Sequence, residues 1–267
     1  MELTQRMLRR LRLRVAQPKY PIDTALVQAA VAADGAGADI YGSIRNPAMH
    51  LVYRYLTQFA APVLTAYADR PLKELRVLDW GGGKGYAAYF LQQLGAQVKL
   101  YETNAFPHRT LWHKLHLQAK TSNGPALPFE AKMFDAVIGF GVLEHVPYDY
   151  DALKEVNRVL KDDGLFFCFN LPNQTGYVHK VTRWRGVRYH DRLYTKRETK
   201  LLLRRAGFNF VGKPWFRQLL PKTHYHYPYP RLFERLDLIA TNYTPLGYLA
   251  ASIEFVARKQ HTYTAVH

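Results

Sequence analysis

Short apolar runs alternate along the middle of the chain with longer stretches in which apolar residues recur every three or four positions. The first run, 76–80, leads through several glycines into an amphipathic segment at 86–94. Further apolar runs of strand length lie at 98–101, 134–138, 165–169 and 209–212, and helical periodicity separates two of them at 153–160. Strands that alternate with helices predict an α/β fold, in which helices cover both faces of a mainly parallel, doubly wound sheet.

Two helix starts stand out from their local residues. Pro47 suits the first position of a helix, which we expect to run over 47–68. Thr195 and Glu198 have the spacing of a capping box, in which each side chain binds the backbone of the other residue. The long helix comes before the alternating region, so residues 1–70 are predicted to form an N-terminal helical cap.

Two long connections interrupt the pattern in the second half of the chain. They lie near 171–194 and 214–247, and a last apolar strand follows the second one at 252–257. Loops of this length in a compact domain are usually functional. Residues 71–267 are therefore predicted to form one main domain with two insertions that cover a substrate.

The glycine-rich stretch after the first apolar run carries the clearest chemistry. Asp79 lies at the end of that run, and it is followed by Gly81, Gly82, Gly83 and Gly85. Glycine lacks a Cβ, so the chain can adopt positive φ there and a ligand can approach the backbone closely. The first turn of the helix that follows would offer unpaired N–H groups. The stretch therefore predicts a site for a nucleotide-like cofactor.

Three nucleotide-binding motifs share this arrangement but differ in their spacing. In a dinucleotide-binding motif, Tyr86 would occupy the place of the third glycine. In a P-loop, Leu78 would occupy the place of the first glycine, and Lys84 is followed by glycine instead of Ser or Thr. The spacing Asp-x-Gly-x-Gly-x-Gly remains, and by itself it is only moderately specific.

Residues farther along the chain agree with this spacing. The second apolar run ends in Glu102, about where a doubly wound sheet places the acid that binds a ribose diol. Leu-Pro-Phe at 127–129, the run at 134–138 and Leu-Glu-His at 143–145 follow in order. With this ordered set, which covers roughly 75–211, the chain resembles the class I S-adenosylmethionine-dependent methyltransferases. Within that family it is similar to the broad group that methylates small molecules, quinones and glycans.

The resemblance implies a Rossmann-like fold with a seven-stranded sheet, a reversed last strand and S-adenosylmethionine as the cofactor. Asp79 and the backbone from Gly81 to Gly83 would hold the methionine end of that cofactor, and Glu102 would bind its ribose. Phe140 would begin the floor of the cleft. Asn123 stands where the family often has an acid for the adenine amino group, and its carbonyl oxygen can accept the same hydrogen bond.

An aliphatic hydroxyl that accepts a methyl group must also lose its proton, and a histidine can remove it because its pKa lies near neutrality. His145 follows the fourth strand, and His190 lies in the first insertion. For each, a hydrogen-bonded structural histidine is the alternative. Asp191 either orients His190 or pairs with a neighbouring arginine. His224 and His226 have no carboxylate near them in sequence, so the sequence predicts no metal site.

The charge of the chain is concentrated in two segments. The net charge is +16. Residues 1–19 contribute +5 and residues 180–235 contribute +12, whereas all other residues together contribute −1. A positive field beside the predicted site attracts an anionic substrate or surface. The alternative is a basic surface that only keeps the protein soluble.

Residues 1–15 form a basic amphipathic pattern that fits three roles. Such a helix can pack on the domain, lie on an anionic membrane, or act as an organellar targeting segment. The only cysteine, Cys168, excludes an intramolecular disulfide and agrees with a reducing compartment. No apolar run reaches the roughly 20 residues that span a bilayer, and no uncharged N-terminal run resembles a secretory signal. We expect a cytoplasmic protein that can contact a membrane surface.

Three functional hypotheses follow. The first is an O-methyltransferase that acts on an anionic small molecule or glycan, including a phosphorylated or lipid-linked sugar at the membrane face. The second is an RNA methyltransferase, because basic segments with interleaved Tyr and Trp suit backbone contact and base stacking. The third is a non-catalytic binding subunit, which would be expected to have lost the glycine turn that this chain retains.

Overall fold

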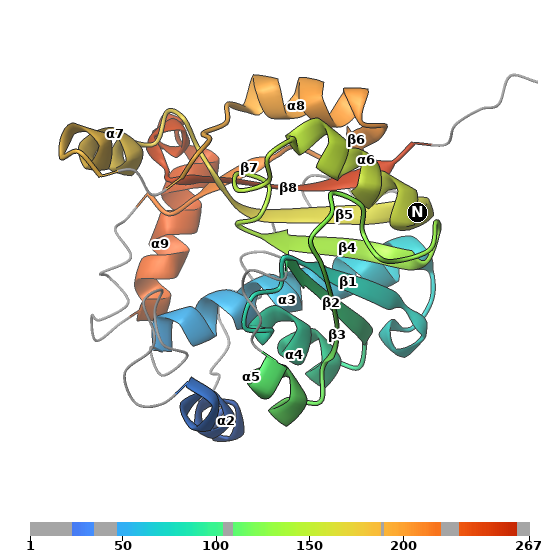
Figure 1. The fold of residues 1–267 in the computed structure, drawn as a ribbon. Helices are drawn as coiled ribbons and strands as arrows, with labels where there is room; N and C mark the ends of the chain where they lie inside the picture. Colours follow the sequence, from blue (N-terminus) through green and yellow to red (C-terminus); the bar gives the residue numbers. More distant parts are fainter. Residues whose placement is uncertain (1–22, 35–46, 104–108, 188–189, 220–229, 261–267) are drawn as a thin grey trace, which may run out of the picture.

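The computed structural model describes residues 23–34, 47–103, 109–187, 190–219 and 230–260 of the chain. At its centre is an eight-stranded sheet with the order β3-β2-β1-β4-β5-β8-β6, and β7 pairs with β8 beside this path (Figure 1). The strands are β1 (Arg76–Trp80), β2 (Gln97–Thr103), β3 (Gln118–Ser122), β4 (Phe134–Phe140), β5 (Leu160–Pro172), β6 (Phe208–Phe210), β7 (Trp215–Arg217) and β8 (Ser252–Lys259).

The sheet is parallel from β3 to β5 and reverses direction at β8. β1 lies between β2 and β4, and β4 pairs in parallel with β5. β8 runs antiparallel to both β5 and β6. The predicted α/β fold with a reversed last strand is confirmed, but the sheet has eight strands instead of the seven that the resemblance implies.

One strand lies where the sequence predicts only an insertion. β7 pairs with β8 through Trp215 opposite Glu254 and Arg217 opposite Ser252. The Arg217 side chain is buried, and its Nε donates to Glu254 Oε1 at 2.7 Å. Nε1 of Trp215 donates to the same carboxylate at 2.8 Å. A strand of three residues that ends in a buried charge has too little periodicity to be recognised from its sequence.

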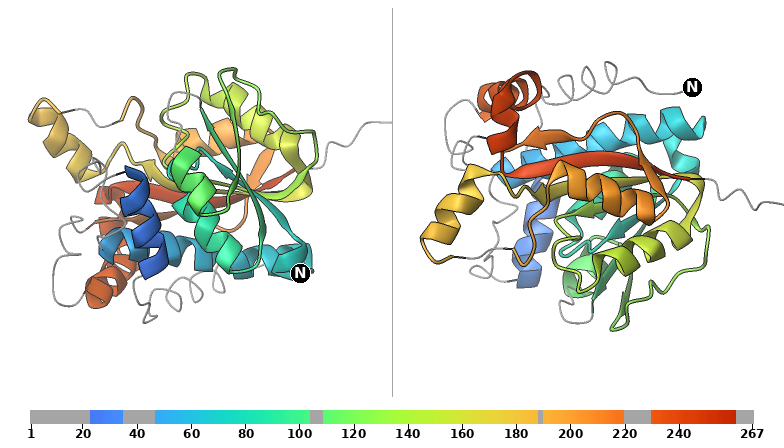
Figure 2. Two further views of the ribbon diagram at one scale, coloured as in Figure 1. Left: turned by 60° about the horizontal axis from the view of Figure 1, so that its bottom comes forward. Right: turned by 90° about the horizontal axis from the view of Figure 1, so that it is seen from above.

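Helices cover both faces of the sheet. Seen from above, α3 lies on one face, whereas α6 and α8 lie on the other (Figure 2). α7 and α9 lie beyond the end of the sheet where β4 and β5 finish (Figure 1). The α-helices are α2 (Thr24–Asp34), α3 (Pro47–Ala68), α4 (Tyr86–Gln93), α5 (Arg109–Lys114), α6 (Asp149–Val159), α7 (Tyr177–Trp184), α8 (Lys196–Arg205) and α9 (Pro230–Tyr243).

A separate apolar core fills each face. On the α3 side, the ring of Phe59 lies 6.4 Å from that of Phe169 in β5 and 5.3 Å from that of Trp215. On the other side, the ring of Phe166 lies 5.9 Å from that of Phe208. Because α3 shares its core with β5, this helix of the predicted N-terminal cap packs directly on the main sheet.

Both predicted helix starts are present. α3 begins at Pro47, and α8 begins after Thr195. The Thr195 hydroxyl accepts a hydrogen bond from the Glu198 N–H, and the Glu198 carboxylate accepts one from the Thr195 N–H at 2.9 Å. Asp163 and Gly164, which precede the apolar run at 165–169, are part of β5. Asp163 has a φ of 63°, so the strand bends there without ending.

Each of the two predicted insertions contains a helix, α7 in the first and α9 in the second. His224 and His226 lie outside the described residues, as does the basic segment 1–15. Among the helices that the structure describes, none has both the length and the apolar character that a membrane crossing requires.

Candidate active site

The glycine turn between β1 and α4 is tightly packed on one side and open on the other. Gly81 and Gly83 have φ angles of 65° and 52°, where glycine is favoured. A Cβ on Gly81 would lie 2.7 Å from Val142, and a Cβ on Gly82 would lie 2.7 Å from Leu100. At Gly83, by contrast, no atom of the described residues lies within 4 Å of the place of a Cβ. The open side leaves the backbone accessible to a ligand.

Asp79 lies beneath this turn and is 1% exposed. Its Oδ2 accepts a hydrogen bond from the Ala88 N–H in the first turn of α4 at 2.9 Å. Burial raises the pKa of Asp79 to about 7, and the nearby Glu102 carboxylate adds to the increase. The carboxylate therefore fixes the start of α4. A cationic group bound above the turn would stabilise its ionised form.

Glu102 and Asn123 lie at the same edge of the sheet as the turn. Glu102 Oε2 accepts a hydrogen bond from the Gly83 N–H at 2.8 Å, and Oε1 accepts one from the Thr103 N–H at 2.7 Å. Asn123 is exposed and directly follows Ser122, which is paired with Thr103. Both residues therefore lie at the end of the sheet where β2 and β3 finish.

Aromatic side chains lie beside the turn where β4 and β5 end. The ring of Phe140 lies 5.1 Å from that of Phe169 and 5.5 Å from that of Tyr53 in α3. The Tyr53 ring lies 5.6 Å from that of Tyr86, the first residue of α4. Phe140 is therefore part of an apolar surface next to the glycine turn.

A buried glutamate lies next to both predicted histidines. Glu144 is 1% exposed, and its Oε1 lies 3.9 Å from His145 Nε2 and 3.8 Å from His190 Nδ1. Its Oε2 has no hydrogen-bond partner among the described residues. Burial raises the pKa of Glu144 to about 7. Asp191 lies 3.6 Å from His145 Nδ1, so it faces His145 instead of the expected His190 or an arginine. An acid of near-neutral pKa beside two imidazoles is suited to accepting and passing a proton.

The same cluster could hold a metal ion. Three possible metal-ligating atoms lie within 4.8 Å of one another, one each from Glu144, His145 and His190. Two imidazoles and one carboxylate are a common ligand set for divalent transition metals. The sequence prediction of no metal site considered only neighbouring residues, whereas these donors come from two separate segments of the chain.

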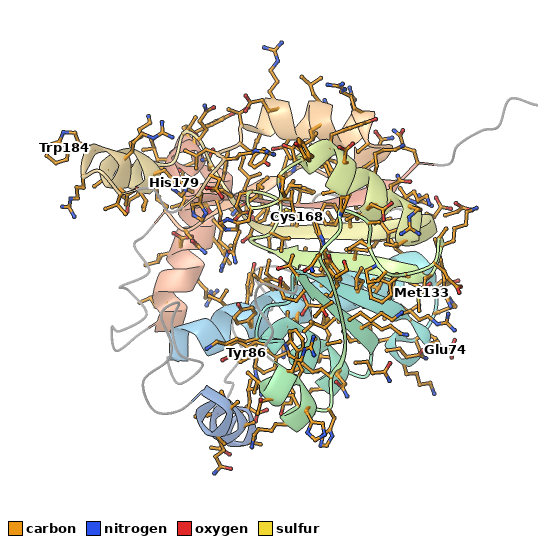
Figure 3. All side chains as sticks on the ribbon, viewed as in Figure 1. Glu74, Tyr86, Met133, Cys168, His179 and Trp184 are labelled. Carbon is orange, nitrogen blue, oxygen red and sulfur yellow. The ribbon has the colours of Figure 1, made fainter. Side chains whose placement is uncertain are left out.

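A pocket of about 230 Å³ opens beside His190. His179 extends from α7 toward the body of the molecule, where its Nε2 is 2.8 Å from the Ala251 carbonyl oxygen, whereas Trp184 lies at the outer end of the helix (Figure 3). The pocket combines a guanidinium, two histidines and apolar side chains. Its lining residues are His179, Thr182, Arg183, Val187, His190, Asp191 and Leu193.

Comparison with known proteins agrees with this arrangement. Residues 52–212, more than half of the chain, match the family model described as a methyltransferase domain. The chain belongs to this methyltransferase family. The match begins within α3 and ends just after β6, so it includes the glycine turn, Glu102, Glu144 and both predicted histidines.

Two curated relatives of this methyltransferase are similar over part of their length. The ubiquinone biosynthesis O-methyltransferase of Roseobacter denitrificans is 32% identical over 163 residues, which are 56% of this chain and 66% of that protein. The protein of the same name from Ruegeria sp. is 29% identical over 162 residues, with 55% and 66% covered. The matched region thus spans just under two thirds of these relatives.

Solved structures share the fold at low sequence identity. A putative sarcosine dimethylglycine methyltransferase from Galdieria sulphuraria has a TM-score of 0.55 and 16% identity, with 92% of each chain covered. A possible histamine N-methyltransferase from Thermotoga maritima has a TM-score of 0.52 and 16% identity, with 81% of this chain and 97% of that chain covered. Both support the Rossmann-like architecture of this methyltransferase.

The described residues fit S-adenosylmethionine, the cofactor that the family implies. This cofactor supplies a methyl group on a positively charged sulfur. The open backbone at Gly83 suits close approach, Glu102 supplies acceptor oxygens for hydroxyl groups, and the buried Asp79 favours a positive ligand. The contacts with the cofactor that the resemblance assigns to Asp79, the glycine turn, Glu102, Asn123 and Phe140 stay predictions.

Sequence reasoning missed Glu144 as a functional residue. The sequence places it directly before His145, where an acid at a loop is usually solvated. Only the fold buries it and brings His190, 46 positions later, to its carboxylate. The apolar residues near it in sequence, Leu143 before it and Val146 two positions after it, were the one available sign of burial.

The raised pKa values of Asp79 and Glu144 predict the pH dependence of stability. The folded protein retains protons on these carboxyls between about pH 4 and 7, where the unfolded chain has released them. The free energy of unfolding should therefore fall as pH rises through this window, by about 1 kcal/mol per pH unit for each acid. We expect Glu144→Gln to remove about half of this slope in urea denaturation at pH 5, 6, 7 and 8, because glutamine does not titrate. Equal slopes in the two proteins would contradict the assignment.

Proposed function

We propose that this methyltransferase transfers a methyl group from S-adenosylmethionine to a hydroxyl oxygen of an anionic small molecule or glycan. The cluster of Glu144, His145 and His190 is the observation that carries the proposal, because a hydroxyl must lose a proton when it is methylated. The two relatives are both named O-methyltransferases, which supports oxygen as the methylated atom. Methyl transfer itself is an in-line displacement, so the remaining task of the protein is to align the acceptor and exclude water.

The charge beside the site supports an anionic acceptor. The pocket next to His190 contains Arg183, and residues 180–235 carry a balance of +12. Guanidinium groups bind carboxylates and phosphates through charge-assisted hydrogen bonds. A phosphorylated or lipid-linked sugar fits this chemistry. An anionic precursor of a lipid quinone is a second candidate, which the names of the relatives favour.

The outer end of α7 supports a reaction at the cytoplasmic face of an anionic membrane. Trp184 is 86% exposed, and Val181 and Val187 are each 41% exposed. Lys180, Arg183 and Arg185 lie on the same segment. An exposed tryptophan among basic residues suits the interface between water and lipid.

A labelled-methyl assay tests the activity. Wild-type protein is incubated with S-adenosylmethionine labelled in its methyl group and with separate lipid, glycan and RNA extracts. We expect base-stable label in the lipid or glycan extract. Label in RNA alone would favour the RNA methyltransferase hypothesis, and label in none of them would favour a non-catalytic subunit.

Liposome flotation tests the membrane contact. We expect wild-type protein to float with vesicles that contain anionic lipid and Trp184→Glu to float several-fold less, because a charged side chain cannot enter the interface at low cost. Leu201→Glu on α8 is the matched control, since Leu201 is also exposed, at 53%, but lies on a different helix. Equal flotation of Trp184→Glu and the wild type would argue against contact through α7.

A further inference from the structure

β5 is irregular at Asn170, close to the predicted cleft. Asn170 has a φ of 60°, and the pairing of β5 with β8 shifts register between Cys168 and Leu171. Such bulges turn a side chain away from the direction that a regular strand would give it, and they are common next to active sites. Asn170 is half-buried. The bulge therefore sets the direction of its side chain, which does not follow the usual alternation of side chains between the two faces of a strand.

The oxygen of the Asn170 side chain is held by two donors. Gln218 Nε2 donates to Asn170 Oδ1 at 3.2 Å, and Arg217 Nη2 lies 3.5 Å from the same oxygen. Arg217 is itself fixed, because its Nε donates to the buried Glu254 carboxylate at 2.7 Å. Because a guanidinium has donors only, the contact with Arg217 determines which end of the Asn170 amide is the oxygen.

The amide nitrogen of Asn170 therefore points away from Arg217 and Gln218. The structure records no hydrogen bond from Asn170 Nδ2 to any residue that it describes. Phe169, the preceding residue, is paired with Phe140, and its carbonyl oxygen accepts a hydrogen bond from the Gly141 N–H at 2.9 Å. Asn170 thus directly follows the last β5 residue that pairs with β4, and β5 continues beside β8 to Pro172. Glu144 follows three residues after Gly141 in the same loop.

We propose that the side-chain amide of Asn170 donates a hydrogen bond to an oxygen of the methyl acceptor. This inference rests on the proposed function. The buried ion pair of Arg217 and Glu254 orients the Asn170 amide and so acts only through that residue. The ion pair has no net charge, so it does not itself attract an anionic acceptor. The amide then provides a neutral donor in a fixed direction, and such a donor selects for an oxygen at one place in the acceptor.

Substitution with aspartate separates this role from the structural one. Asn170→Asp keeps an oxygen for Arg217 and Gln218 but replaces the donor by a second acceptor. We expect the apparent KM for the extract that the wild type methylates to rise at least about 10-fold, since a buried polar group of the acceptor would lose its partner. The Kd for S-adenosylhomocysteine, measured by calorimetry, should stay within twofold of the wild type. Asn170→Gly, which tolerates the positive φ, should raise KM in the same way.

Asn157→Asp is the matched control. Its Nδ2 donates to the Ala206 and Gly207 carbonyl oxygens near the start of β6. Asn157 lies shortly before β5 begins, whereas the glycine turn follows the end of β1. We expect a lower melting temperature and an unchanged KM. A wild-type KM in both Asn170 variants would overturn the inference and leave the proposed function intact. If the wild type labels no extract, the proposed function fails and the inference fails with it.

Discussion

Replacing Glu102 by alanine is expected to weaken the binding of S-adenosylhomocysteine by at least about 100-fold. Its carboxylate lies at the end of β2, within hydrogen-bond distance of the Gly83 N–H. Two hydrogen bonds from ribose hydroxyls to a charged acceptor, each contributing about 1.5 kcal/mol or more, account for a loss of that size. The loss of the bond from Gly83 would also loosen the turn. Isothermal titration calorimetry of the wild type and the variant measures the change directly.

Glu130→Ala is the control for this substitution. Glu130 is an exposed glutamate in the loop before β4, so the variant has the same change in charge and should bind the ligand like the wild type. Melting temperatures of both variants show whether the fold is intact. If Glu102→Ala bound S-adenosylhomocysteine within threefold of the wild type, the carboxylate would have no part in holding the cofactor.

The combined substitution His145→Ala and His190→Ala is expected to lower kcat by at least about 100-fold and to leave cofactor binding unchanged. General base catalysis typically contributes a factor of 10² to 10⁴. Glu144 lies within 4 Å of both imidazoles, so Glu144→Gln should also reduce turnover. Because the three side chains act on one proton, we expect their effects to be far from additive. Initial rates of label transfer into the methylated extract measure the effect.

His113→Ala in α5 is the matched control, since this histidine is exposed and distant in sequence from the cluster. It should turn over like the wild type. Full turnover by the double histidine variant would refute the proton-transfer role. Loss of wild-type turnover on chelation by EDTA, with recovery on adding Zn²⁺ or Fe²⁺, would assign the cluster to a metal ion instead.

The turn that is predicted to bind the cofactor could be located from sequence because its signals are local. Asp79, the spaced glycines and the apolar run before them lie within about ten residues, and steric limits on φ act over that distance. The helix start at Pro47 and the capping box at Thr195 and Glu198 were predictable for the same reason.

The contacts of the candidate site were less accessible to sequence reasoning because they join distant segments. β7 forms from three residues, and it is stabilised when Arg217 meets Glu254, 37 positions away. The amide of Asn170 is oriented by side chains nearly fifty positions later. Glu144 becomes a near-neutral acid only because packing removes it from water.

The amino-acid sequence by itself indicated an α/β protein that resembles the methyltransferase family, and it predicted Asp79, the glycine turn and Glu102 as cofactor-binding residues. Periodicity and turn chemistry are properties of neighbouring residues, so the chain order displays them. The tertiary structure alone decided that Glu144 is buried beside His145 and His190 and that Arg217 and Gln218 hold the side-chain oxygen of Asn170. Burial and long-range contact arise only when the sheet brings separate segments together, and it is this desolvation and fixed orientation that gives ordinary side chains their chemistry.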